Sequence, residues 1–164
     1  MSGRFNALTL ACLGTVLSLA ILPGAQASEV LHYINGHFGF GIDYPANTFA
    51  MDPPPENDAG RTFRAITGHA NFTIWGSNNS LKQTTTEIAD DESRDCLHNP
   101  SYRLVKRRLA VLSCETPDGI IYDKTVVAGD VLVNFHIIYP DAERERWDSV
   151  TASIANSMKM LPKR

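Results

Sequence analysis

The sequence predicts an α+β fold, in which an antiparallel β-sheet has helices packed on it. Three observations lead to this class. Residues 120–139 alternate around Gly129-Asp130, a two-residue loop with Gly first that suits a type II′ hairpin turn. The neighbouring strand candidates are joined by short turns, which favour antiparallel pairing. After Pro140, apolar residues recur every three or four positions, as in a helix that covers one face of a sheet.

The hairpin turn decides which residues face each other, because opposed residue numbers must sum to 259 about Gly129-Asp130. One face of the hairpin is then nearly all apolar. The other face is apolar at its ends and polar in the middle, where Asp123 opposes His136 and Thr125 opposes Asn134. A slip of one residue would exchange the two faces. We therefore expect the main core on one face and partial cover on the other.

The N-terminal half of the chain predicts two further hairpins. Their expected strands are Glu29–Ile34, Phe38–Tyr44, Arg61–Ile66 and Asn71–Trp75. Asn35-Gly36 is the first turn, and Asn47–Met51 is expected to form a helical turn. Residues 52–60 are expected to form an irregular loop, because three prolines cannot join a strand ladder.

The C-terminal half predicts a weak helix, a meander of four strands and a strong helix. Ser80 is the expected N-cap of a surface helix over Leu81–Ser93. Tyr102–Val105 and Leu109–Glu115 are expected to pair ahead of the hairpin at 120–139. Asp141 is the expected N-cap of the final helix. The apolar stripe of that helix is Trp147, Val150, Ile154, Met158 and Leu161.

Residues 1–27 have the three parts of a secretory signal peptide. Arg4 supplies positive charge, Ala7–Leu22 is an apolar run, and Ala25-Gln26-Ala27 is a small-x-small cleavage motif. The apolar run is too short for a stable membrane span, and an uncleaved anchor is the alternative. We expect cleavage after Ala27, a periplasmic or secreted protein with no stable membrane span, and a single domain over residues 28–164.

Charge and cysteine content narrow the class of protein further. Without Arg4, 14 basic residues remain against 18 acidic ones, a mature net charge of −4. The basic residues are scattered apart from Lys106–Arg108, which we interpret as a solvated turn, so no nucleic-acid binding is expected. Cys96 and Cys114 are the two mature cysteines. In an exported chain they are most simply a disulfide, and metal binding is the alternative.

Several of these motifs resemble those of small exported bacterial proteins of the PsbP-like fold. They are Tyr33-x-Asn35-x-x-Phe38-Gly39-Phe40-x-Ile42-Asp43-Tyr44-Pro45, a Pro-rich loop before Gly60-Arg61-Thr62-Phe63, a strand ending near Gly76-x-Asn78-Asn79, and Tyr139-Pro140 before a closing helix with Ser157-Met158. The resemblance implies an α/β/α sandwich. It also implies a non-catalytic binding or scaffold role without a cofactor, as in extrinsic photosystem subunits. Related chains usually have Gly where Cys114 stands, which suggests that the bridge is particular to this protein.

The residues give no motif for catalysis or metal binding. The five histidines are His32, His37, His69, His98 and His136, and they form no paired metal-ligand spacing. Asp123 and His136 are the most specific polar pair, which we interpret as a cross-strand charge pair. A catalytic dyad would also need a nucleophile. We therefore assign no catalytic residue, no metal ligand and no cofactor.

These observations predict a periplasmic, non-catalytic binding or interaction protein with a protein partner in the cell envelope. The candidate interaction surface is the Pro-rich loop with Arg61 and the loop at Asn78 and Asn79, because loops on a rigid scaffold often carry function. Two alternatives stay open. One is a small periplasmic hydrolase or metal-dependent enzyme that uses His136 and Asp123, and the other is a toxin-neutralising envelope protein.

Overall fold

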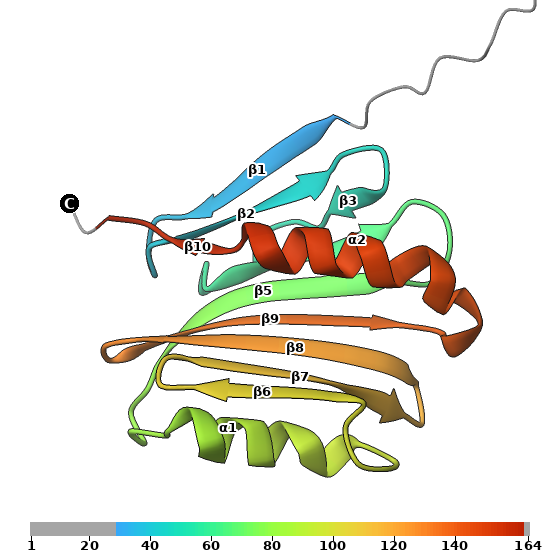
Figure 1. The fold of residues 1–164 in the computed structure, drawn as a ribbon. Helices are drawn as coiled ribbons and strands as arrows, with labels where there is room; N and C mark the ends of the chain where they lie inside the picture. The colour runs from blue at the N-terminus through green and yellow to red at the C-terminus, as the bar shows by residue number, and fades with distance from the viewer. Residues whose placement is uncertain (1–28, 163–164) are drawn as a thin grey trace, which may run out of the picture.

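The computed structural model describes residues 29–162, and the predicted signal peptide over residues 1–27 lies outside that range. Two antiparallel sheets and two α-helices make up most of the described chain (Figure 1). The elements are β1 (Val30–Asn35), β2 (Phe40–Pro45), β3 (Phe49–Met51), β4 (Gly60–Ala65), β5 (Asn71–Asn78), α1 (Thr85–Glu92), β6 (Tyr102–Lys106), β7 (Leu109–Thr116), β8 (Gly119–Ala128), β9 (Val131–Tyr139), α2 (Arg144–Ser157) and β10 (Lys159–Met160). Short 3₁₀ turns at Ser93–Asp95 and Asp141–Glu143 follow α1 and precede α2.

The large sheet has the strand order β3-β4-β5-β9-β8-β7-β6, and the small sheet has the order β1-β2-β10. Neighbouring strands are antiparallel throughout both sheets. Residues of α2 and of the small sheet share the main core with one face of the large sheet, whereas α1 packs on the other face. The predicted α+β fold, with helices on both faces of an antiparallel sheet, is confirmed.

The hairpin of β8 and β9 has the predicted register. Its pairs run from Ile120 opposite Tyr139 to Ala128 opposite Val131. Gly129 has a φ of +68°, and Asp130 is not among the described residues with positive φ. A positive φ at the first loop position alone is the requirement of a type II′ turn, so the glycine at this position is needed.

The main core is built around aromatic side chains. Phe63 and Phe72 stack with ring centroids 4.3 Å apart, and Phe135 packs against Phe72 at 5.5 Å. Trp147 of α2 is fully buried, and its Nε1–H donates a 2.7 Å hydrogen bond to Glu143. The predicted apolar face of the hairpin points into this core, and the predicted division into a main core and a partly covered face is confirmed.

Two predictions for the N-terminal half are wrong. Asn47–Met51 does not form a helical turn: Phe49–Met51 is β3, because Phe49 is buried in the core and pairs with Ala65. Phe38 does not belong to β2. It lies in the turn between β1 and β2, where Asn35 Oδ1 accepts a hydrogen bond from its N–H and its ring packs so closely on Gly76 that no side chain would fit there.

The two helices begin later than predicted. The N-cap of α1 is Thr84, because Thr84 and Glu87 form a reciprocal capping box, whereas Ser80 lies outside the helix and β5 continues through Asn78. Asp141 does not cap α2. It forms an ion pair with Arg144, the first residue of the helix. The helix ends at Ser157, so Leu161 lies beyond it, after β10.

Candidate functional site

A polar cluster occupies the middle of the less covered sheet face, where the sequence predicts the Asp123–His136 pair. His136 Nδ1 lies 2.6 Å from Asp123 Oδ1 across β9 and β8. Thr125 Oγ1 lies 3.0 Å from Asn134 Oδ1 and 3.0 Å from Glu92 Oε1. Glu92 is the last residue of α1, so the helix places a third acidic or basic group over the strand pair.

Burial changes the protonation of this cluster. The pKa of Glu92 rises to about 7, first because burial disfavours its charged form and then because Asp123 repels it. The pKa of His136 is also raised, chiefly by its hydrogen bond to Asp123. The Thr125 hydroxyl has one hydrogen and two acceptor neighbours. A protonated Glu92 can donate to Thr125 while Thr125 donates to Asn134, and this arrangement gives the Thr125 hydroxyl both a donor and an acceptor.

The cluster contains only some of the catalytic groups that a hydrolase needs. Asp123 can orient the imidazole of His136, as the third member of a catalytic triad does. Among residues 29–162, no serine, threonine or cysteine forms a hydrogen bond with His136, and no three His, Cys, Asp or Glu side chains are placed to hold a metal ion. The geometry accounts for these residues as a polar support between α1 and the sheet.

Cys96 and Cys114 form a disulfide, with 5.7 Å between their Cα atoms. Cys114 is in β7, and Cys96 directly follows the 3₁₀ turn after α1. The bridge packs with Leu112, Ile121 and Ile138 on the same sheet face as the polar cluster. It therefore fixes the C-terminal end of α1 close to the strands that carry Asp123 and His136.

The three residues of the predicted interaction surface have different environments. The Arg61 side chain is only 15% exposed, pairs with Asp58 at 3.0 Å and lies over the ring of Tyr33. Asn79 is buried and holds its turn by two hydrogen bonds with Gln83. Asn78 is exposed at the end of β5, opposite Val131. Of the three, only Asn78 presents a largely accessible side chain.

A mostly apolar groove of about 1140 Å³ lies beside Asn78, at the end of the molecule where β1 turns into β2 and β8 turns into β9. We call it the end groove. It is lined by Ile34, Gly36, His37, Phe38, Gly39, Arg108, Ala128, Gly129, Val131, Met160, Leu161 and Pro162.

Hydrogen bonds connect the loops at this end of the molecule. Asn35 donates to the carbonyl of Asp58 in the Pro-rich loop at 2.7 Å. The N–H of Leu161 donates to Gly39 at 2.8 Å, and the N–H of Asn79 donates to Asp130 at 2.8 Å. The two predicted loops therefore lie at the same end of the molecule as the groove. The groove could not be predicted from the sequence because its walls are far apart in the chain, although the position of Ile34 between inward-facing Tyr33 and Asn35 indicates an outward side chain.

Within residues 29–162, neither helix is long and apolar enough to span a bilayer.

Comparisons with known proteins identify the fold. No protein-family model and no curated protein matches the sequence. The structure is similar to the solution structure of cyanobacterial PsbP (CyanoP) from Synechocystis sp. PCC 6803, with a TM-score of 0.58 and 15% identity over 87% of this chain and 98% of that one. It is also similar to a crystal structure from Bacteroides thetaiotaomicron, with a TM-score of 0.52 and 11% identity over 80% of this chain and 48% of that one. The fold is therefore PsbP-like, as the motifs predicted, and identities this low establish the fold alone.

Proposed function

We propose that this chain is an exported, non-catalytic binding protein of the cell envelope that docks a protein partner in the end groove. The observation that carries the proposal is the exposure of apolar side chains in that groove, where Ile34 is 61% exposed and Met160 is 37% exposed. Clustered exposed apolar residues are typical of interaction sites. The disulfide supports an oxidising compartment, as the predicted signal peptide does.

Charge at the rim of the groove indicates the chemistry of the partner. Arg108 lines the groove and lies with Arg107 in the turn between β6 and β7, next to Lys106 at the end of β6, and all three residues are exposed. A partner segment that presents an apolar side chain next to acidic residues would match both the floor and the rim. Arg108 therefore has a proposed role beyond that of a solvated turn residue.

The test is capture of an envelope partner by wild-type protein and by two matched variants. The Ile34→Ser, Met160→Ser double variant removes apolar surface from the groove. Ile66→Ser removes a similar side chain, 55% exposed, beyond the opposite end of β4. We expect the same stoichiometric partner with wild type and Ile66→Ser, and its loss with the double variant and with Arg108→Glu.

Two results would count against this function. One is the absence of a stoichiometric partner for the wild type, and the other is equal capture by the groove variants. Export is tested separately by mass spectrometry of the secreted chain, for which we expect Ser28 as the first residue. If a hydrolytic activity is detected and is abolished by His136→Ala while His69→Ala leaves it unchanged, the enzymatic alternative replaces the proposal.

A further inference from the structure

A second cleft, of about 210 Å³, lies between the first turns of α2 and strands β6 to β8. It opens on the face of the large sheet that holds the main core, at the edge of that core. Helix α2 packs against β8 and β9 there, so Tyr102 on β6 stays 49% exposed. We call this the tyrosine cleft. It is distinct from the end groove, with which it shares no lining residue.

The strand register gives the cleft its floor. Tyr102, Ser113 and Tyr122 are neighbours across β6, β7 and β8, so they form one row on the same sheet face. Two tyrosines separated by one strand stand about 10 Å apart, since adjacent strands are about 4.8 Å apart. The small side chain of Ser113 leaves a notch between them. Such a notch is wide enough for one flat ring.

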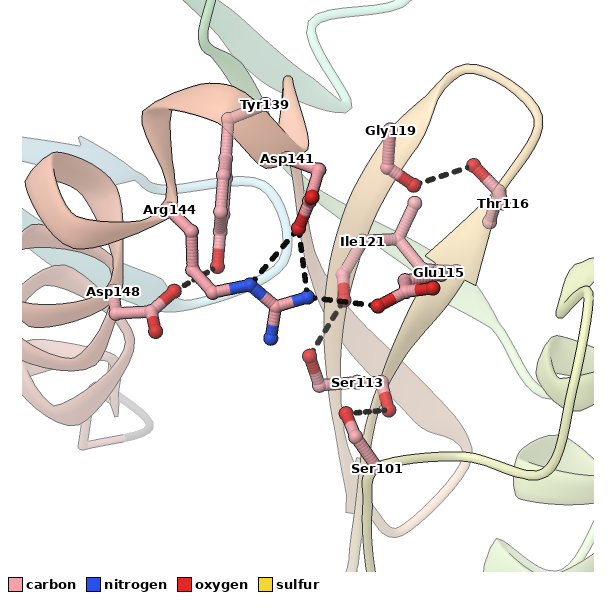
Figure 2. A network of polar contacts seen from close by, with 10 residues as sticks. All are labelled: Ser101, Ser113, Glu115, Thr116, Gly119, Ile121, Tyr139, Asp141, Arg144 and Asp148. Atoms are coloured by element: carbon pink, nitrogen blue, oxygen red, sulfur yellow. Dashed lines mark hydrogen bonds and ion pairs between the residues drawn. The ribbon is translucent and has the colours of Figure 1, made fainter.

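The wall of the cleft comes from Arg144 and Asp148, one helical turn apart on α2. Arg144 uses Nε and Nη2 to bind Asp141 and uses Nη2 to reach Glu115 at 2.9 Å. Its Nη1 has no hydrogen-bond partner within residues 29–162, and Figure 2 shows this nitrogen without a dashed line. Asp148 accepts from Tyr139 with one oxygen at 2.7 Å and has no protein partner in the described chain for the other.

Thr151 also lines the cleft. It is only 2% exposed, and its hydroxyl lies close to that of Tyr139, with which it interacts. The cleft therefore combines an open donor and an open acceptor with tyrosine side chains.

The groups that line the cleft disfavour both anionic and cationic ligands. The positive charge of Arg144 is surrounded by the carboxylates of Asp141, Glu115 and Asp148, so the net local charge is negative and repels anions. A cation would be attracted by this net charge, but it would also meet the N–H groups of Arg144 Nη1, which can only donate. A donor and an acceptor that line the same cleft instead suit the hydroxyls of a neutral ligand, one accepting from Arg144 and another donating to Asp148. The apolar face of a ring would pack on a tyrosine.

We propose that the tyrosine cleft binds a neutral saccharide unit, which occupies the notch between Tyr102 and Tyr122 and is held by Arg144 and Asp148. This site goes beyond the protein docking proposed above. Neither site depends on the other, because the groove variants leave every residue of the cleft in place.

The experiment is a titration followed by amide and Arg Nε–H chemical shifts of the oxidised domain. The probes are glucose, galactose, mannose and N-acetylglucosamine, together with n-butylammonium and butyrate as charged probes. We expect saturable shifts at Ser113 and Arg144 with at least one saccharide, and none with either charged probe. Asp148→Asn and Tyr102→Ala should each weaken that binding about 10-fold or more, because each removes a charged hydrogen bond or an aromatic surface.

The matched control is Glu145→Gln, which removes an exposed carboxylate from the same helix turn but from outside the cleft. It should bind the saccharide as the wild type does. The proposal is overturned if no saccharide gives a saturable shift in the cleft, if n-butylammonium or butyrate saturates it instead, or if Asp148→Asn and Tyr102→Ala bind as the wild type does. Amide spectra of each variant establish that it is folded.

Discussion

Glu92 Oε1 at the end of α1 lies 3.0 Å from Thr125 Oγ1 in the middle of the large sheet. The other carboxylate oxygen of Glu92 is buried without a partner among the described residues. A charge is poorly stabilised in such a place, and the pKa of Glu92 near 7 follows from this burial and from Asp123 nearby. The helix is therefore held on the sheet best when Glu92 carries a proton.

Stability should fall as the pH rises from 5 to 8. A pKa raised from 4.5 in the unfolded chain to about 7 in the folded protein contributes stability that is complete below pH 4.5 and is lost as the pH passes 7. His136 acts in the same direction, because its pKa is also raised. We expect a loss on the order of 2 kcal/mol in the free energy of unfolding, measured by urea denaturation at both pH values.

Glu92→Gln provides the control for this pH dependence. The amide can donate to Thr125 as the protonated acid does, and it does not titrate. We expect the variant to be more stable than the wild type at pH 8 and to keep only the smaller dependence that His136 provides. An unchanged slope between pH 5 and 8 in Glu92→Gln would contradict the assignment.

Removal of the disulfide should destabilise the domain. The bridge joins positions 18 residues apart, and a loop of this length corresponds to about 3 kcal/mol in the chain-entropy model. We expect the Cys96→Ser, Cys114→Ser double variant to lose about 2–4 kcal/mol in denaturant unfolding. The exported wild type should show no free thiol under denaturing, non-reducing conditions, and two free thiols would refute the bridge.

Trp147→Ala should cost about 3–5 kcal/mol, because it removes a fully buried indole from the contact between α2 and the core. Trp147→Phe should cost less, since it keeps much of the packing and loses the hydrogen bond to Glu143. Thermal or urea unfolding measures both. A loss below about 1 kcal/mol for Trp147→Ala would mean that the helix is not docked as described.

The capping box of α1 can be tested against the cap that the sequence analysis predicted. Thr84→Ala removes the side chain that accepts from the Glu87 N–H, and should cost about 1 kcal/mol. Ser80→Ala should change the stability by less than about 0.5 kcal/mol, because Ser80 lies outside the helix. The reverse order of these two effects would place the start of the helix at Ser80.

Short-range sequence patterns predict those parts of the fold that depend on residues close together in the chain. Gly129-Asp130 fixes the hairpin register through its turn geometry, and the position of His136 opposite Asp123 follows from that register. The pairing of β5 with β9 could not be predicted, because it joins segments about 60 residues apart through core packing. Phe49 was misassigned for the same reason: a three-residue strand has too few positions to show alternation.

In the candidate sites, too, contacts between adjacent strands of one hairpin could be predicted, whereas contacts between distant segments could not. The pair of Asp123 and His136 was visible in the sequence, but Glu92 was not, because its place depends on how α1 docks on the sheet. The expected role of Arg61 assumed an exposed charge, whereas the structure turns its guanidinium toward Tyr33 and Asp58. The Thr84-x-x-Glu87 spacing is a capping-box signal, and it outweighs the N-cap preference of Ser80.

The pairing of β10 with β2 has a consequence for biogenesis. Met160 lies opposite Phe40 and Lys159 opposite Gly41, so the small sheet joins the first hairpin of the described chain to a strand far away in the sequence. Contacts of such large sequence separation form late, since the intervening chain must first be ordered. The nascent polypeptide therefore cannot complete this sheet until β10 has been synthesised, and the first hairpin lacks its third strand until then.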